Sequence, residues 1–260
     1  MGELPRDSVD VLVVGAGPIG LTAAALLDQQ GISSFVVDRK RDFDEHPRAR
    51  FLDSCTLELF RQLGVAQAVE ATGIGPSWTE VITCAESLAG KQIARIPSPE
   101  FYSVPRAITP QIPVMTCQDL VEPILYERVQ SCAGAEVRLA SELTELSQDA
   151  DGCRARVRDL ETDREREISA RFVIGADGVR STVRSAIGAE LEGEVRDTYF
   201  RDVLFHADLS PWIDDLGRKG ALLFVAHLSS ITQTVCPVGR GAPITKEAAR
   251  PPAPCNPSWG

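Results

Sequence analysis

The chain has little of what metal centres, disulfide frameworks and nucleic-acid surfaces are made of. It has three histidines, and its seven cysteines lie far apart without a C-x-x-C pair, which excludes the common zinc and redox motifs. An odd, scattered set of cysteines without a signal peptide predicts reduced thiols and a cytoplasmic location. Basic residues are also in deficit, since 27 Lys and Arg against 37 Asp and Glu give a net charge of −10. We therefore expect a small molecule as partner, and neither nucleic acid nor an anionic membrane.

The composition excludes further classes of protein. A hydrophobic share of 43% with 25% charged residues is that of a core-forming chain, so a transmembrane bundle, general disorder and a collagen-like repeat are all excluded. The 260 residues suffice for one large domain or two small ones.

What the sequence does contain is a glycine-rich turn between a strand and a helix. Residues 9–14 (VDVLVV) are typical of a strand buried on both faces, and GAGPIG (15–20) follows directly. Residues 18–30 are rich in Ala and Leu, with proline in the first turn and Gly31 after the end. A second apolar run lies at 34–37. This order predicts a doubly wound α/β fold.

The glycine spacing has a mechanical reason. Gly15 permits a tight turn, Gly17 lets the backbone approach a pyrophosphate, and Gly20 lets the helix pack close to the strand. The pyrophosphate would lie at the helix N-terminus, beside Pro18 and Ile19, because the free N–H groups and the helix dipole favour negative charge there.

Asp38 closes the second strand at the distance expected of a nucleotide-binding fold. Its carboxylate would accept hydrogen bonds from the adenosine ribose and repel a 2′-phosphate, so we expect NAD or FAD in this pocket rather than NADP. Arg39 either stacks on the adenine or reaches a phosphate, or it is a solvated cation beside Lys40 and Arg41.

The middle of the chain alternates between helical and strand-like patterns. We predict helices at residues 55–63 and 118–129, and strands between them at residues 79–84 and 92–96. Three strand-like stretches then predict a β meander, at residues 136–139, 153–160 and 167–171. Residues 171–175 predict a separate buried strand that runs into the turn at Asp177 and Gly178.

Four segments taken together are more specific than the glycine motif alone. They are GAGPIG with Asp38 and Arg39, HPRARFLDSCTLELFRQLGV (46–65), Gln118 at a helix start, and GADGVRSTVR (175–184). In this order, over roughly residues 8–210, they resemble the FAD-dependent aromatic hydroxylases. These are the flavoprotein monooxygenases that include p-hydroxybenzoate, phenol and aromatic polyketide hydroxylases. The resemblance implies a Rossmann-like FAD-binding fold with a β meander and a substrate-binding sheet, which is incomplete here.

The resemblance also implies which residues bind the cofactor. They are Gly15, Gly17, Pro18, Ile19, Gly20, Asp38, Arg39, Arg48, Gln118, Asp177 and Gly178. Arg48 is implied to contact the flavin side, Gln118 to lie near the pyrophosphate and ribityl chain, and the Asp-Gly pair to support FAD binding and NAD(P)H use. From the residues alone, Arg48 could instead pair with the acidic residues at 42, 44 and 45, and Gln118 could simply cap its helix.

The activity that the resemblance implies is aromatic hydroxylation. NAD(P)H reduces FAD, and O₂ supplies the oxygen atom for an aromatic or phenolic small molecule. We assign no catalytic side chain, because in this chemistry the protein places the cofactor and excludes water. The sequence indicates neither the substrate nor the oligomeric state.

The sequence departs from the family after Arg184. The family's third FAD motif, a Gly-Asp followed by small residues, His and Pro, has no match there. A fragment of a longer protein, a reading frame altered near residue 228, or a minimal variant would each explain this. Two function hypotheses follow: a hydroxylase, inactive without the absent motif, and a non-catalytic FAD- or nucleotide-binding remnant or interaction module. An NAD-dependent reductase is less favoured.

The motif order divides the chain into five segments. We expect a first FAD-binding segment (βαβ), substrate-domain strands and loops, a second FAD-binding segment with the meander and the Asp-Gly motif, a partial substrate-domain sheet, and a Pro-rich disordered tail. The two FAD-binding segments are residues 1–70 and 116–190, the substrate-domain segments are residues 71–115 and 191–235, and the tail is residues 236–260.

Overall fold

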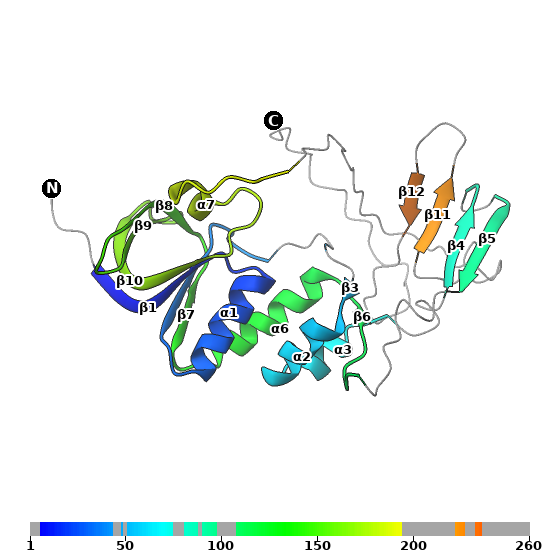
Figure 1. Cartoon of the computed structure of the whole chain (residues 1–260), viewed down its shortest axis with the longest axis horizontal. Helices are drawn as coiled ribbons and strands as arrows, with labels where there is room; N and C mark the ends of the chain where they lie inside the picture. Colours follow the sequence, from blue (N-terminus) through cyan, green and yellow to red (C-terminus); the bar gives the residue numbers. More distant parts are fainter. Residues whose placement is uncertain are drawn as a thin grey trace. The chain divides into compact units, whose positions relative to one another are not determined.

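The chain divides into two compact units. One comprises Met1–Gly73 with Val104–Tyr199, and the other Ile74–Ser103 with Phe200–Gly260. The computed structural model shown in Figure 1 describes residues 6–43, 48, 51–74, 81–87, 90–97, 108–193, 222–226 and 232–235. The predicted tail at 236–260 lies outside the described residues.

A six-stranded sheet organises the first unit, in the order β7-β2-β1-β10-β9-β8. Its strands are β1 (Arg6–Val14), β2 (Ser34–Val37), β7 (Ala135–Arg138), β8 (Ser141–Gln148), β9 (Cys153–Asp159) and β10 (Glu165–Gly175). The four strands β7, β2, β1 and β10 are parallel to one another. The strands β10, β9 and β8 pair antiparallel. The predicted α/β fold class, a Rossmann-like sheet with a β meander, is confirmed.

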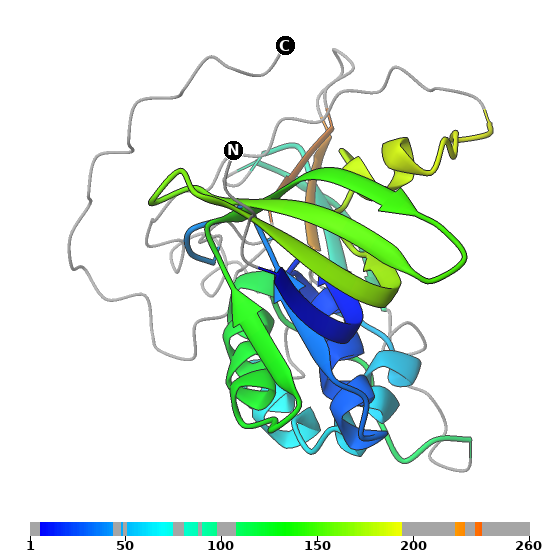
Figure 2. The same cartoon turned by 90° about the vertical axis from the view of Figure 1, so that its left-hand side faces the viewer.

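Two helices cover one face of the parallel strands. Figures 1 and 2 show α1 (Pro18–Gln29) and α6 (Gln118–Gln130) side by side on that face, with the meander strands on the other side. Along β1, Val11 and Val13 belong to the apolar cluster under the helices, and Leu12 belongs to the cluster under the meander. Burial on both faces explains the nearly continuous apolar sequence of this strand.

Shorter elements complete the first unit. They are the two-stranded pair β3 (Phe51–Leu52) and β6 (Val114–Met115), and the helices α2 (Ser54–Gln62), α3 (Ala66–Glu70) and α7 (Thr182–Ala186). The predicted helix ends agree with the structure to within one residue for α1, α2 and α6. Gly31 follows α1 with a φ of +70°, as expected of a residue just past a helix end.

The second unit contains a four-stranded sheet in the order β12-β11-β4-β5. Its strands are β4 (Val81–Ala85), β5 (Gln92–Pro97), β11 (Leu222–Ala226) and β12 (Thr232–Val235). β11 pairs parallel with β4, although about 140 residues separate them along the chain. Segments far apart in the sequence thus share one sheet, and local sequence patterns do not predict such a pairing.

The composition of the meander was predicted wrongly. Residues 136–139 contribute to β7, the parallel edge strand beside β2, whereas the first meander strand is β8, which was not predicted. The stretches 167–171 and 171–175 are one strand, β10. β10 pairs with β9 through its first half and with β1 to its end. Because β10 loses its pairing with β9 midway, the sequence pattern of its second half differs from that of its first half.

Candidate functional site

Three loops leave the sheet side by side at its carboxyl edge. Val14 at the end of β1 is paired with Val37 of β2 and with Gly175 of β10. The residues that follow these strand ends therefore meet, and they include the glycine turn, Asp38 and the Asp-Gly segment. Ligands of open α/β sheets bind outside the carboxyl ends of the strands.

Close packing explains two of the three glycines. Gly15 has a φ of +109°, and a Cβ there would lie 2.3 Å from the carbonyl oxygen of Ala176. A Cβ at Gly20 would lie 1.8 Å from the carbonyl oxygen of Gly15. At Gly17, by contrast, a Cβ would approach only Oε1 of Glu122 among the described atoms, at 3.8 Å. The fold itself requires Gly15 and Gly20, whereas Gly17 leaves the backbone accessible.

The N-terminus of α1 is open to an anion. Gly17 is its N-cap and supplies no capping side chain, and the first turn carries no acidic residue. Pro18 begins the helix without an N–H group of its own, and Ile19 is 73% exposed. The remaining N–H groups of the first turn and the helix dipole would stabilise a pyrophosphate. The tight glycine turn and the uncapped helix together fit a dinucleotide.

Asp38 ties the glycine turn to the loop after β2. Its Oδ2 accepts a hydrogen bond from the backbone N–H of Ala16 (2.6 Å), and its Oδ1 accepts one from the N–H of Lys40 (2.8 Å). A carboxylate has about four acceptor positions, so two remain for ligand hydroxyls. The neighbouring Arg39 is exposed.

Gln118 does not cap its helix. The N-cap of α6 is Cys117, and the Gln118 side chain instead donates from Nε2 to Oε1 of Glu122 (2.8 Å). The backbone N–H of Gln118 donates to the carbonyl oxygen of Arg48 (2.8 Å), which places the exposed Arg48 beside the first turn of α6. The structure thus brings together two residues that lie 70 positions apart.

Glu122 and Lys40 also belong to this region, although no sequence pattern predicted a role for them. Glu122 follows Gln118 by one helical turn, its side chain is 2% exposed, and its Oε2 lies 3.1 Å from Nζ of Lys40. A glutamate in the middle of a helix gives no signal by itself, but the spacing of four residues from Gln118 does place both side chains on one face of the helix.

Asp177 shapes the turn that follows β10. Its carboxylate accepts hydrogen bonds from Oγ of Ser181 (2.6 Å) and from the backbone N–H groups of Thr182 (2.6 Å) and Val183 (3.1 Å). Gly178 has a φ of +77°, which disfavours a side chain there. The Asp-Gly pair therefore fixes the segment that packs against Gly15.

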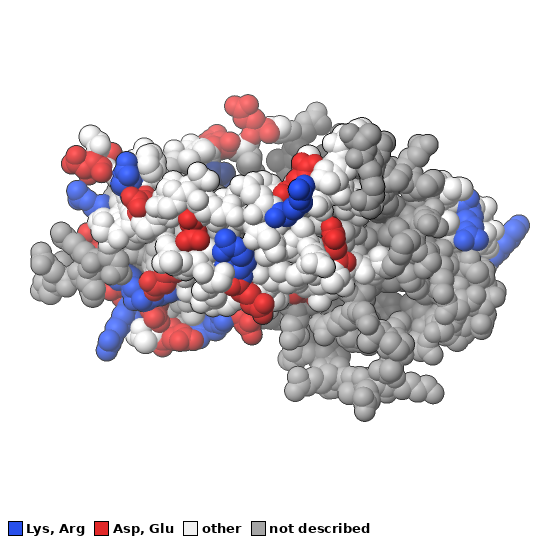
Figure 3. Space-filling view, turned by 90° about the horizontal axis from the view of Figure 1, so that it is seen from below, with Lys and Arg blue, Asp and Glu red and all other residues white. Residues whose placement is uncertain are grey.

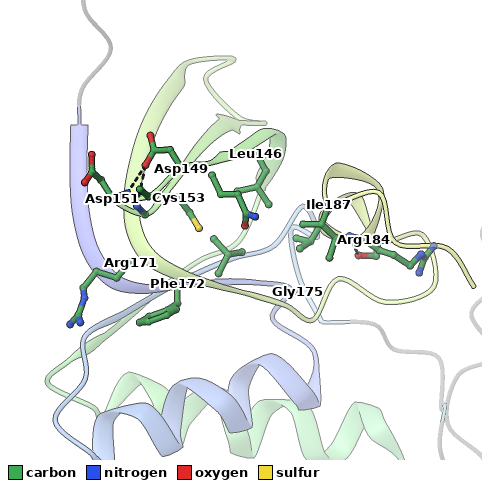
Figure 4. Close-up of a pocket in the computed structure, with 15 residues that line it drawn as sticks. Leu146, Asp149, Asp151, Cys153, Arg171, Phe172, Gly175, Arg184 and Ile187 are labelled. Atoms are coloured by element: carbon green, nitrogen blue, oxygen red, sulfur yellow. Dashed lines mark hydrogen bonds between the residues drawn. The ribbon is translucent and has the colours of Figure 1, made fainter.

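A separate cavity of about 790 Å³ lies between the meander and α7. Figure 4 shows Asp149, Asp151 and Cys153 on its meander side and Arg184 and Ile187 on its α7 side. None of the predicted cofactor-binding residues lines it. This cavity is therefore distinct from the carboxyl edge of the sheet, where the predicted cofactor-binding residues lie.

The charges on the face drawn in Figure 3 are of both signs. Among the described residues there, Lys and Arg side chains alternate with Asp and Glu, without a broad basic area. In the part of the chain that the structure describes, no helix combines the length and apolarity needed to cross a bilayer. Nor do these residues include three or more His, Cys, Asp or Glu side chains grouped as metal ligands.

Comparison with known proteins identifies an FAD binding domain family and relatives named as hydroxylases and monooxygenases. The sequence matches the FAD binding domain family over residues 8–248. It is 36% identical over 211 residues to the aklavinone 12-hydroxylase DnrF of Streptomyces peucetius subsp. caesius, covering 80% of this chain and 43% of the relative. It is 31% identical over 207 residues to the phenol 2-monooxygenase of Pseudomonas sp. strain EST1001, covering 78% and 32%.

The solved structures that resemble this chain include flavin-dependent enzymes. The flavin-dependent monooxygenase PieE, in complex with FAD and substrate, superposes with a TM-score of 0.79 at 30% identity, over 91% of this chain and 42% of that one. The rebeccamycin biosynthetic enzyme RebC with reduced flavin superposes with a TM-score of 0.79 at 27% identity, over 90% and 44%. This chain thus spans less than half the length of the relatives described here.

Proposed function

Because the chain belongs to the FAD binding domain family, we propose that it binds FAD at the carboxyl edge of β2, β1 and β10 and contributes this site to an aromatic hydroxylase. The observation that carries the proposal is the convergence of four separate sequence segments there. The glycine turn is hydrogen-bonded to Asp38 and packs against the Asp-Gly turn. The start of α6 is hydrogen-bonded to Arg48, and the ion pair between Lys40 and Glu122 joins α6 to the loop after Asp38.

Each segment has a distinct task in holding the cofactor. The backbone from Gly17 to Gly20 would bind the pyrophosphate at the N-terminus of α1. Asp38 would accept hydrogen bonds from the ribose through its remaining acceptor positions. Gln118 would contact the pyrophosphate and ribityl chain, and Arg48 the flavin side. Asp177 holds the supporting turn through its bonds to α7.

The reaction that we propose for the whole protein is the hydroxylation of a small aromatic molecule. Bound FAD supplies the redox chemistry, by which NAD(P)H, H⁺, O₂ and an aromatic C–H yield NAD(P)⁺, water and a phenolic C–OH. The relatives named above act on aklavinone and phenol, so we propose a phenolic or polycyclic aromatic substrate. A cytoplasmic location accords with the free thiols at Cys55, Cys84, Cys132 and Cys153.

A second candidate function is FAD binding without turnover. The carboxyl edge of the sheet would support it equally, because the residues proposed to hold FAD include no catalytic side chain. The two candidates share the cofactor site and differ only in whether NAD(P)H is consumed together with an aromatic substrate.

The first prediction tests both candidates on the full chain. We expect the purified protein, incubated with FAD and desalted, to keep a yellow flavin spectrum, and FAD to raise its melting temperature where NAD does not. NADH and NADPH oxidation is then followed with a panel of phenols, and the hydroxylated product is identified by mass spectrometry. Bound FAD without product formation favours the second candidate, and a colourless protein that FAD does not stabilise contradicts both.

A further inference from the structure

An ion pair between Lys40 and the buried Glu122 lies beside the proposed cofactor site. Glu122 is 2% exposed, and its Oε2 lies 3.1 Å from Nζ of Lys40, whose side chain is 22% exposed. Its other carboxylate oxygen accepts the hydrogen bond from Gln118. Both oxygens of a nearly inaccessible carboxylate are thus used, one by a cation and one by an amide.

The ammonium group of Lys40 is held in this place by an aromatic ring as well as by Glu122. Nζ lies 4.5 Å from the centroid of the Phe43 ring, and Phe43 in turn packs edge-on against Tyr126, with the ring centroids 5.1 Å apart. Tyr126 follows Glu122 by one turn of α6. The cation is therefore fixed over α6 by two contacts rather than free to extend into solvent.

The carboxylate faces the place where a pyrophosphate would bind. Oε1 of Glu122 is the atom that a Cβ on Gly17 would approach, at 3.8 Å, and Gly17 begins the first turn of α1. An uncompensated buried carboxylate there would repel the phosphates. In α1 the one charged side chain is Asp28, in the last turn. Other charged residues near Glu122 in the sequence or through a contact include Asp38, Arg39, Asp119 on α6, and Arg48 beside the first turn of α6. Among the described residues, only Lys40 forms an ion pair with Glu122.

We propose that Lys40 and Glu122 are positioning residues that set FAD affinity as a pair: Glu122 orients the Gln118 amide, and Lys40 cancels the charge of Glu122 so that a pyrophosphate can bind beside it. This inference rests on the proposed function, because it concerns the same cofactor site. A different explanation, in which Lys40 contacts the phosphates directly, makes the opposite prediction for a double variant.

The second prediction is a double-variant comparison of FAD affinity, measured by flavin fluorescence quenching on the full chain. We expect Lys40→Met to raise the Kd of FAD by about tenfold or more, since it leaves the Glu122 charge unpaired. Glu122→Gln keeps an acceptor for Gln118 without the charge, and should bind FAD at least as tightly as the wild type. Combining both substitutions should restore the Kd to within about threefold of the wild type, because the two effects are coupled.

The outcomes separate the explanations. A double variant that binds as weakly as Lys40→Met overturns charge cancellation, and so does weaker binding by Glu122→Gln in a protein that melts normally. If Lys40→Met does not fold, the affinities of Glu122→Gln and of the double variant still decide. The control is Arg156→Met with Glu145→Gln, a surface ion pair 2.8 Å apart between the meander strands β9 and β8, which should leave FAD affinity unchanged. A wild-type chain that binds no FAD overturns the proposed function and this inference together.

Discussion

At the scale of single residues, Gly17 and Gly20 separate cofactor binding from folding. A methyl group on Gly20 would lie 1.8 Å from a backbone oxygen, so we expect Gly20→Ala to destabilise the protein by about 2 kcal/mol or more. Gly17→Ala has room in the protein and should cost less than about 1 kcal/mol, yet its methyl group would stand between the backbone and a pyrophosphate. Urea unfolding and FAD titration measure the two effects. Equal losses of stability in both variants would contradict this division.

At the scale of the element, α2 depends on its N-cap. Asp53 accepts a hydrogen bond from the N–H of Thr56 (2.8 Å), and its bonds to the Thr56 hydroxyl and backbone lower the pKa of its carboxyl below the ordinary 3.8. A lowered pKa means that the carboxylate stabilises the fold above pH 3.8 and that this contribution disappears as the pH falls through the lowered value. We expect Asp53→Ala to cost about 1 kcal/mol at pH 7, and less as the pH falls below 4.

The matched variant for this cap is Asp53→Asn. The amide oxygen still accepts the bond from Thr56 but does not titrate, so Asp53→Asn should retain most of the stability, and its difference from Asp53→Ala should not change with pH. Urea unfolding between pH 7 and pH 3 makes the comparison. An Asp53→Asn protein as unstable as Asp53→Ala would show that charge, and not the hydrogen bond, holds the start of α2.

The same scale shows what the sequence could and could not predict. β1, α1 and β2 follow from local signals, such as the apolar run at 9–14 and the residue Gly31 after the helix. The partner of a strand has no such signal, which is why residues 136–139 were assigned to the meander although they pair with β2. β8 was missed because its sequence, SELTELSQ, has only two apolar residues. The pair of Lys40 and Glu122 spans 82 positions, and only the folded chain brings them together.

At the scale of the whole molecule, the predicted cofactor-binding residues all belong to the first of the two compact units. Binding stabilises the state that binds, by about 2.7 kcal/mol at a ligand concentration of 100 times the Kd. Hydrogen exchange of the full chain with and without FAD should therefore slow at the carboxyl edge, in residues 15–20, 38–41 and 176–178, and across β1 and α1. Exchange in β4 and β5 of the second unit should change little. Slowing confined to β4 and β5 would instead place the ligand in the second unit and contradict the site proposed for FAD.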